Sequence, residues 1–174
     1  QGEPWQPGLG VPLVPKGDPM LAAIGPGAYA ERSDKPELTL EGEPLIAPLR
    51  VATDAFIEPR DPDPRGMKVV GADGVVAGTV KDAWIDRSEP QVRYLEVEVA
   101  GAAGGKSVLL PITLARVNGW RRQVKVKSVL ASQFADVPTL KDPDQVTKLE
   151  EDRITAYYAG GTLFATPSRL EPIL

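Results

Sequence analysis

The chain contains no cysteine and no histidine among its 174 residues. Without cysteine it has no disulfides and no thiolate metal ligands. Without histidine it lacks the usual general base near neutral pH and the commonest ligand of transition metals. Zinc hydrolases, Ser-His-Asp triads and histidine-based phosphotransfer are therefore excluded within this chain.

Long apolar runs and an excess of positive charge are missing as well. No stretch approaches the ~20 apolar residues that cross a bilayer, and no signal peptide opens the chain. The formal net charge of −4 argues against an extended nucleic-acid-binding surface, so we expect no nucleic-acid partner. The chain begins with Gln1 rather than methionine, which indicates a truncated or processed fragment that is soluble by itself.

Proline is concentrated near the start, where the first 64 residues hold twelve of the 18 prolines. Because proline fixes its own φ and disfavours helix at the preceding residue, this region is expected to be extended and rich in turns. A disordered linker is one interpretation. Apolar side chains such as Trp5, Met20 and Tyr29 favour instead an arm that packs on the domain or on a partner.

Residues 67–129 carry a β pattern. Asp73-Gly74 predicts a turn between two apolar runs, and Gly78 marks a bulge or bend. The segment 87–90 separates two further strands, 75–86 and 93–99. In the second of these, apolar residues alternate with Glu96 and Glu98, which predicts a half-buried strand with a solvated glutamate face. Five or six short strands at this spacing predict a mainly β fold, either a small antiparallel barrel or a sandwich.

A helix is predicted after the strands. Thr147 and Glu150 match a capping box, and apolar residues at helical spacing follow from Ile154 onward. Gly160 and Gly161 could terminate this helix or lie inside it. We favour the longer helix, which ends before the proline at position 167.

Two charged clusters need an interpretation. Glu150, Glu151 and Asp152 could bind a cation, but acids in the first turn more often complement the helix dipole. A basic cluster surrounds Trp120 and comprises Arg116, Arg121, Arg122, Lys125 and Lys127. Nucleic-acid binding is conceivable there. A solvated strand face or attraction to anionic lipid is the simpler interpretation.

Six blocks of the sequence together resemble one family. In chain order they are GDPMLAAIGPGAYAER (17–32), PEL (36–38), PLRVATD (48–54), the stretch 75–99, SQFADVP (132–138) and LEEDRITAYYAGGTLFATP (149–167). They resemble the cytoplasmic part of the H subunit of purple-bacterial photosynthetic reaction centres. This sequence lacks the N-terminal membrane helix of that subunit.

The resemblance implies a fold and a function. The fold would be an extended proline-rich arm (1–48), a PRC-type barrel (49–140) and a C-terminal helix and tail packed on the barrel (141–174). The function would be that of a non-pigmented cap on the cytoplasmic face of the bacterial photosynthetic membrane, which is not an enzyme. Such a cap would contact the L and M subunits and the membrane surface, and would conduct protons toward the secondary quinone. It would bind no cofactor directly, since quinone, bacteriochlorophyll and non-haem iron belong to the partner subunits.

The resemblance also implies site residues. Asp86, Glu89 and Arg93 match the family's ionisable groups near the proton route, with Glu89 as a buried relay carboxylate and Arg93 as its charge partner. Glu37 matches a further acidic position. Where some family members have surface histidines, this chain has Glu41 and Glu43, so we expect the proton entrance to use carboxylates. Without the resemblance, the same acidic turn reads as a solvated hairpin end.

One alternative function remains at this point. A soluble PRC-barrel adaptor of the ribosome-maturation type, which binds protein or RNA, would share the barrel. Such an adaptor has no need for a long arm that follows a membrane surface.

Overall fold

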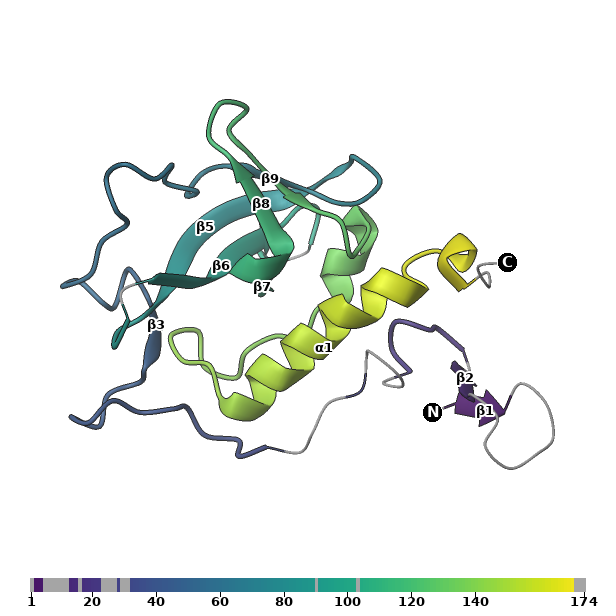
Figure 1. Ribbon diagram of the computed structural model, residues 1–174, viewed down its shortest axis with the longest axis horizontal. Helices are drawn as coiled ribbons and strands as arrows, with labels where there is room; N and C mark the ends of the chain where they lie inside the picture. Colours follow the sequence, from purple (N-terminus) through teal and green to yellow (C-terminus); the bar gives the residue numbers. More distant parts are fainter. Residues whose placement is uncertain are drawn as a thin grey trace.

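The computed structural model describes residues 2–4, 13–15, 17–22, 28, 32–89, 91–102 and 104–170. Its body is a curled seven-stranded sheet with one long helix against it (Figure 1). The strands are β3 (Ile46–Pro48), β4 (Lys68–Val70), β5 (Val76–Asp86), β6 (Gln91–Val99), β7 (Ser107–Pro111), β8 (Ala115–Asn118) and β9 (Gln123–Val126). The helix is α1 (Lys148–Phe164), and β1 (Gly2–Pro4) pairs with β2 (Leu13–Pro15) apart from the sheet.

The sheet runs in the order β7-β6-β5-β4-β9-β8, and β3 pairs with β5 as well. The long strand β5 therefore has β6 along one edge and the two short strands β3 and β4 along the other. These contacts make a curled half-barrel, which confirms the predicted mainly β, PRC-type fold. One pairing departs from an antiparallel barrel: β4 and β9 are parallel, because a long crossover rather than a hairpin joins them.

The β5–β6 hairpin confirms the predicted strand pair and explains the curl of the sheet. Its register shifts between Val80 and Asp82 and again between Trp84 and Ile85, and such irregularities increase the bend and twist of a strand. Near Gly78 the two strands approach closely, since a Cβ added there would lie 2.1 Å from the carbonyl oxygen of Glu98. The β4–β5 register also shifts beside Gly78, as predicted.

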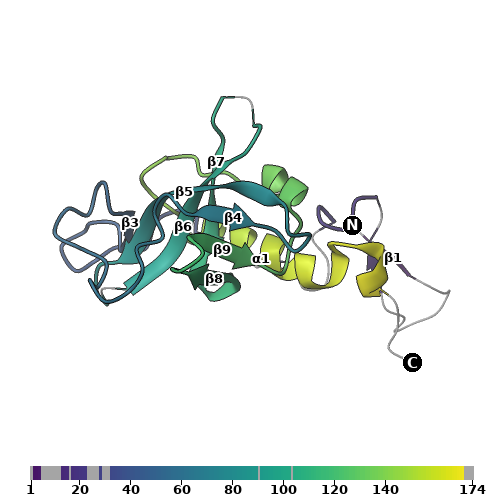
Figure 2. The same ribbon diagram turned by 90° about the horizontal axis from the view of Figure 1, so that it is seen from above.

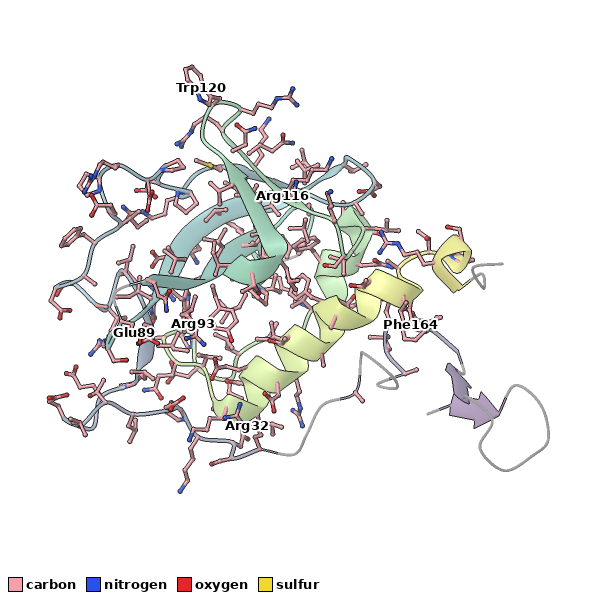
Figure 3. All side chains as sticks on the ribbon, viewed as in Figure 1. Arg32, Glu89, Arg93, Arg116, Trp120 and Phe164 are labelled. Carbon is pink, nitrogen blue, oxygen red and sulfur yellow. The ribbon has the colours of Figure 1, made fainter. Side chains whose placement is uncertain are left out.

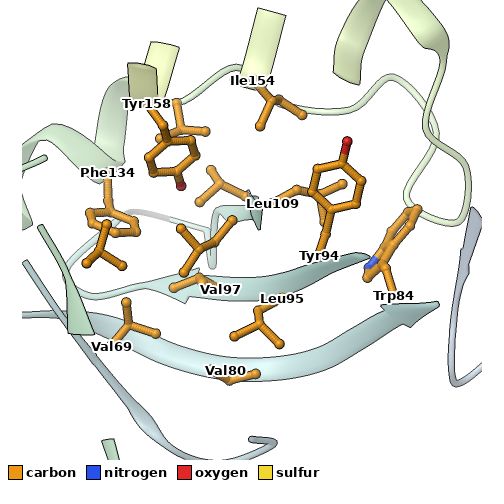
Figure 4. Close-up of a cluster of buried hydrophobic side chains, with 14 of the residues drawn as sticks. Val69, Val80, Trp84, Tyr94, Leu95, Val97, Leu109, Phe134, Ile154 and Tyr158 are labelled. Atoms are coloured by element: carbon orange, nitrogen blue, oxygen red, sulfur yellow. The ribbon is translucent and has the colours of Figure 1, made fainter. Parts of the chain in front are cut away.

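The core lies between the sheet and α1. Figure 4 shows Ile154 and Tyr158 of α1 facing Tyr94 of β6 and Leu109 of β7. Trp84 is completely buried. The middle of β6, from Tyr94 to Val97, is buried on both sides, because α1 and the loops cover its outer face. The predicted solvated glutamate face is therefore wrong for Glu96, which is only 5% exposed, and right for Glu98.

The start and length of α1 agree with the sequence. The Thr147 side chain accepts a hydrogen bond from the Glu150 amide (3.1 Å), and a Glu150 carboxylate oxygen accepts one from the Thr147 amide (2.9 Å). This is the predicted capping box. The helix continues through Gly160 and Gly161 to Phe164, so the longer helix is confirmed. The predicted β pattern extends to residue 129, but the last strand, β9, ends at Val126.

The described end of the arm is attached to the N-terminus of α1. The amides of Lys148 and Leu149 donate hydrogen bonds to the carbonyl oxygens of Lys35 (3.1 Å) and Ser33 (3.2 Å). These amides belong to the first helical turn and have no partner within the helix. The arm thus satisfies part of the helix terminus. Met20 joins the hydrophobic core from farther up the arm.

Parts of the predicted arm, including Trp5 and Tyr29, lie outside the described residues. In Figure 2, β1 lies beyond the C-terminal end of α1, at the opposite end of the molecule from β3. Within the described ranges, no helix combines the length and apolar character needed to cross a bilayer. The division into segments at residues 48 and 140 remains a prediction.

Candidate functional site

Asp86 ends β5 and organises the turn that follows it. Its Oδ1 accepts hydrogen bonds from the Ser88 amide (2.9 Å), the Ser88 hydroxyl (2.8 Å) and the Glu89 amide (3.2 Å). Burial raises the pKa of the Asp86 carboxyl, but these hydrogen bonds and the charge of Arg93 outweigh it, so that the pKa falls below the ordinary 3.8. Asp86 is therefore a fixed negative charge at neutral pH.

Arg93 lies on β6 opposite this turn. Its Nη1 donates to Asp86 Oδ2 at 3.3 Å, so within this chain the charge partner of Arg93 is Asp86 and not Glu89. Glu89 is exposed at the tip of the turn and accepts a hydrogen bond from Gln91 Nε2 at 3.3 Å. Glu89 is thus not buried as predicted, because none of the described segments covers the tip. Figure 3 shows Glu89 and Arg93 close together at the same end of the molecule.

A second carboxylate reaches this site from α1. Glu151 Oε1 accepts a hydrogen bond from the Tyr94 hydroxyl at 2.8 Å. Burial raises the pKa of Glu151 above its ordinary 4.5, and the charge of Glu37 adds to the rise. The Tyr94 hydrogen bond and the charges of Arg93 and Arg32 oppose it without cancelling it. Glu151 consequently holds a proton more readily than Asp86 does.

The three acids predicted to act on the arm, Glu37, Glu41 and Glu43, differ in their contacts with the site. Glu43 forms an ion pair with Arg87, the residue that follows Asp86, and is thus joined to the turn. Glu37 is exposed, and its charge acts on Glu151. Glu41 is exposed at the tip of a tight turn in which the Gly42 amide donates to the Thr39 carbonyl oxygen. The structure therefore links Glu37 and Glu43 to the site and leaves Glu41 at its outer side.

The pKa values of Asp86 and Glu151 are shifted in opposite directions, so the two carboxylates should make the stability of the fold depend on pH in opposite ways. Asp86 has a lowered pKa, so its stabilisation is present above about pH 4 and is lost as pH falls through its folded-state pKa. Asp86→Asn should thus cost about 1 kcal/mol at pH 7 and less at pH 3. Glu151 has a raised pKa, so its contribution is complete below pH 4.5 and is lost as pH rises.

Glu151→Gln should therefore stabilise the fold at pH 8 relative to the original chain, and the gain should vanish at pH 4. The glutamine can still accept the Tyr94 hydrogen bond. Urea unfolding of both variants across this range measures the two trends. The same sign of pH dependence in both variants would contradict the assignment.

A second charged cluster lies where the arm meets the barrel, and the sequence did not indicate it. Arg50 Nη1 donates to Glu96 Oε2 at 2.5 Å and to Asp82 Oδ2 at 3.2 Å, and Nε donates to Asp144 Oδ1 at 3.0 Å. Trp84 Nε1 donates to the same Glu96 oxygen at 3.1 Å. Asp82 and Glu96 are both nearly inaccessible. Arg50 thus compensates two buried carboxylates and connects the segment after β3 to the outer face of the sheet.

The sequence also missed Tyr94, Glu151 and Arg32 as parts of the first site. The sequence pattern assigned no role to Tyr94 or Arg32, and it indicated that Glu151 complements the helix dipole. The acids at the start of α1 all have partners: Glu150 caps the helix, Glu151 binds Tyr94, and Asp152 pairs with Arg32 at 3.1 Å. Within the part of the chain that the structure describes, no group of three or more acids is arranged to hold a metal ion.

Comparison with protein families gives two matches along the chain. Residues 1–51 match the H-chain N-terminal region of the photosynthetic reaction centre. Residues 57–132 match the PRC-barrel domain, which corresponds to the strands from β4 to β9. The first match covers the arm, including Glu37, Glu41 and Glu43, and the second covers the turn that carries Asp86 and Glu89.

Proposed function

Since the chain is an H-subunit-like PRC-barrel protein of the photosynthetic reaction centre, we propose that it caps the cytoplasmic side of the pigment-bearing core and passes protons toward the secondary quinone. Its partners are the membrane-embedded L and M subunits, which hold the quinone, bacteriochlorophyll and non-haem iron. It acts as an accessory subunit and not as an enzyme. The match of the arm to the H-chain region favours this function over a soluble adaptor.

The observation that supports proton transfer is the grouping of unlike carboxylates around Arg93. Asp86 stays ionised because several donors stabilise its charge, whereas Glu151 is half-buried and holds a proton more tightly. Proton transfer requires groups whose proton affinity lies near the working pH, and burial is one way to raise a carboxylate into that range. Asp86 and Arg93 set the local field, and Glu89 and Glu151 exchange the proton.

Glu89 fits the role of the carrier next to the core. Its side chain is exposed on this chain, at the tip of a turn that the buried Asp86 holds in place. A partner subunit that covers the tip would shield the Glu89 carboxylate from bulk water and place it beside the core. Glu43, which is tied to Arg87 of the same turn, and Glu37, whose charge reaches Glu151, connect this position to solvent along the arm.

The test is Glu89→Gln in the assembled reaction centre. Glutamine preserves size and removes the exchangeable acidic proton, so we expect proton uptake coupled to reduction of the secondary quinone to slow roughly tenfold or more. Primary charge separation should be unchanged. Flash-induced absorbance of a pH-sensitive dye measures the uptake. Glu98→Gln is the matched control, because Glu98 is an exposed glutamate at the far end of the β5–β6 hairpin.

The possible results distinguish a role of Glu89 in proton transfer from a role in assembly of the complex. Slow proton uptake in an intact complex supports the relay, and Arg93→Leu should then shift the pH dependence of that step, because it removes the charge that faces Asp86 and Glu151. Loss of the complex in Glu89→Gln would indicate a structural contact. Unchanged proton uptake at several pH values in both variants would refute the relay.

A further inference from the structure

The β8–β9 hairpin carries a basic surface that the proposed proton relay does not use. Arg116 of β8 lies directly opposite Lys125 of β9, and both are exposed. Lys68 of β4 and Lys127 lie on the same outer face, since their buried neighbours Val69, Val124 and Val126 point to the core. We call this surface the basic face; its members are Lys68, Arg116, Arg121, Lys125 and Lys127.

Within the described residues, no ion pair neutralises this positive charge. In the described ranges, none of the five side chains of the basic face takes part in an ion pair, and like charges placed directly opposite on a sheet repel each other. The neighbouring loop 58–65 contains three acids, and in the described structure none of them forms an ion pair with the basic face. Its Glu58 pairs with Arg60 and its Asp63 with Arg65, while the charge of Arg122 acts on Asp63 as well.

Trp120 stands at the tip of the same hairpin and is fully exposed. Figure 3 shows its ring projecting away from the body of the molecule, with Arg116 farther down the hairpin. The turn holds Trp120 in place, because Asn118 Oδ1 accepts a hydrogen bond from the Arg121 amide and Arg122 adopts a positive φ of 49°. The Arg122 side chain then donates to the carbonyl oxygens of Asp63 and Arg65. The backbone that carries Trp120 is therefore braced, while its ring stays accessible to a surface outside this chain.

We propose that the basic face and Trp120 together dock on a bilayer that contains anionic lipid. Tryptophan is favoured at the membrane–water interface, where its ring lies among the headgroups and its N–H remains hydrated. Lysine and arginine near an anionic surface each add about 1 kcal/mol of attraction. The net charge of −4 does not prevent this, because at physiological salt charges beyond about 8 Å are screened and the local surface decides. The inference is independent of the proton relay.

The experiment measures flotation of the purified chain with two kinds of vesicle. One contains phosphatidylcholine alone, and the other contains 30% phosphatidylglycerol (about one lipid in three). We expect binding only to the second kind, with loss at about 1 M salt, where the Debye length falls to about 3 Å. The double variant Arg116→Gln/Lys125→Gln should bind about 30-fold more weakly, which corresponds to two cations at ~1 kcal/mol each.

A matched control removes the same number of positive charges from positions away from the basic face. Lys35→Gln/Lys141→Gln removes two exposed cations near the N-terminal end of α1, and it should retain full binding. Trp120→Tyr should abolish the blue shift of tryptophan emission on vesicle binding, because Trp120 is the tryptophan on the proposed docking surface. Unfolding curves that match the original chain exclude misfolding of any variant.

Several results would overturn the proposal. These are equal binding to neutral and anionic vesicles, equal loss of binding in the control and the double variant, or an emission shift that survives in Trp120→Tyr. Tighter binding of a single-stranded oligonucleotide than of anionic vesicles at the same salt concentration would assign the surface to nucleic acid instead.

Discussion

Arg50→Ala is expected to destabilise the fold by about 3 kcal/mol, toward the lower end of the cost of breaking a buried ion pair. The substitution leaves Asp82 and Glu96 buried without the guanidinium that compensates them. The cost is not higher because about a third of the Arg50 side chain is exposed and water can enter. Urea unfolding followed by circular dichroism measures the change.

A rescue variant distinguishes lost compensation from lost packing. Arg50 also lies over the Trp84 ring, at 5.9 Å from its centre, so some of the cost comes from that contact. If most of the lost stability comes from uncompensated charge, adding Asp82→Asn and Glu96→Gln to Arg50→Ala should recover most of it. Arg60→Ala is the control, because its ion pair is on the surface and should be worth less than about 1 kcal/mol. Failure of the rescue would show that packing on Trp84 matters most.

The same cluster affects how the arm is held. Arg50 follows β3 within two residues, and its Nη2 donates to the carbonyl oxygen of Pro143, near the start of α1. Arg50 thus connects the end of the arm, the sheet and the segment before the helix. In the proposed complex, its loss should weaken attachment of the arm before it affects proton transfer.

Gly161→Ala is expected to destabilise the protein by about 2 kcal/mol, in the range of overpacked cores. In an exposed helix the same change would stabilise by about 1 kcal/mol. Here a Cβ would lie 2.3 Å from the Ser128 carbonyl oxygen and 2.6 Å from Val129 Cγ1, so that backbone has to move. Arg169 restricts that movement, because its Nη1 donates to the carbonyl oxygens of both Ser128 and Gly161.

Thr162→Ala provides the control for this prediction. Thr162 is exposed at the next position of α1, so the substitution should stabilise slightly through helix propensity alone. Thermal unfolding of the two variants gives their midpoints. A raised midpoint for Gly161→Ala would show that α1 can shift away from the segment after β9.

The sequence by itself determined the elements that depend on local rules. The capping box at Thr147 and Glu150 fixed the start of α1, and the Asp-Gly turn and the alternation in 75–99 fixed the hairpins, because these signals act between residues close in the chain. The resemblance of six blocks was sufficient to identify the family. It also indicated Asp86, Glu89 and Arg93, which the structure gathers at one turn.

Only the tertiary structure decided which charged side chains contact one another. Glu96 looked solvated in its strand, yet it is buried because Arg50, 46 residues away, folds over the sheet. Glu151 looked like a helix-dipole acid, yet Tyr94 and Arg93 of β6 draw it into the site. The alternation in a sequence shows which side of a strand a residue occupies. Whether a helix or a loop covers that side, and so changes the cost of a charge there, depends on contacts between distant parts of the chain.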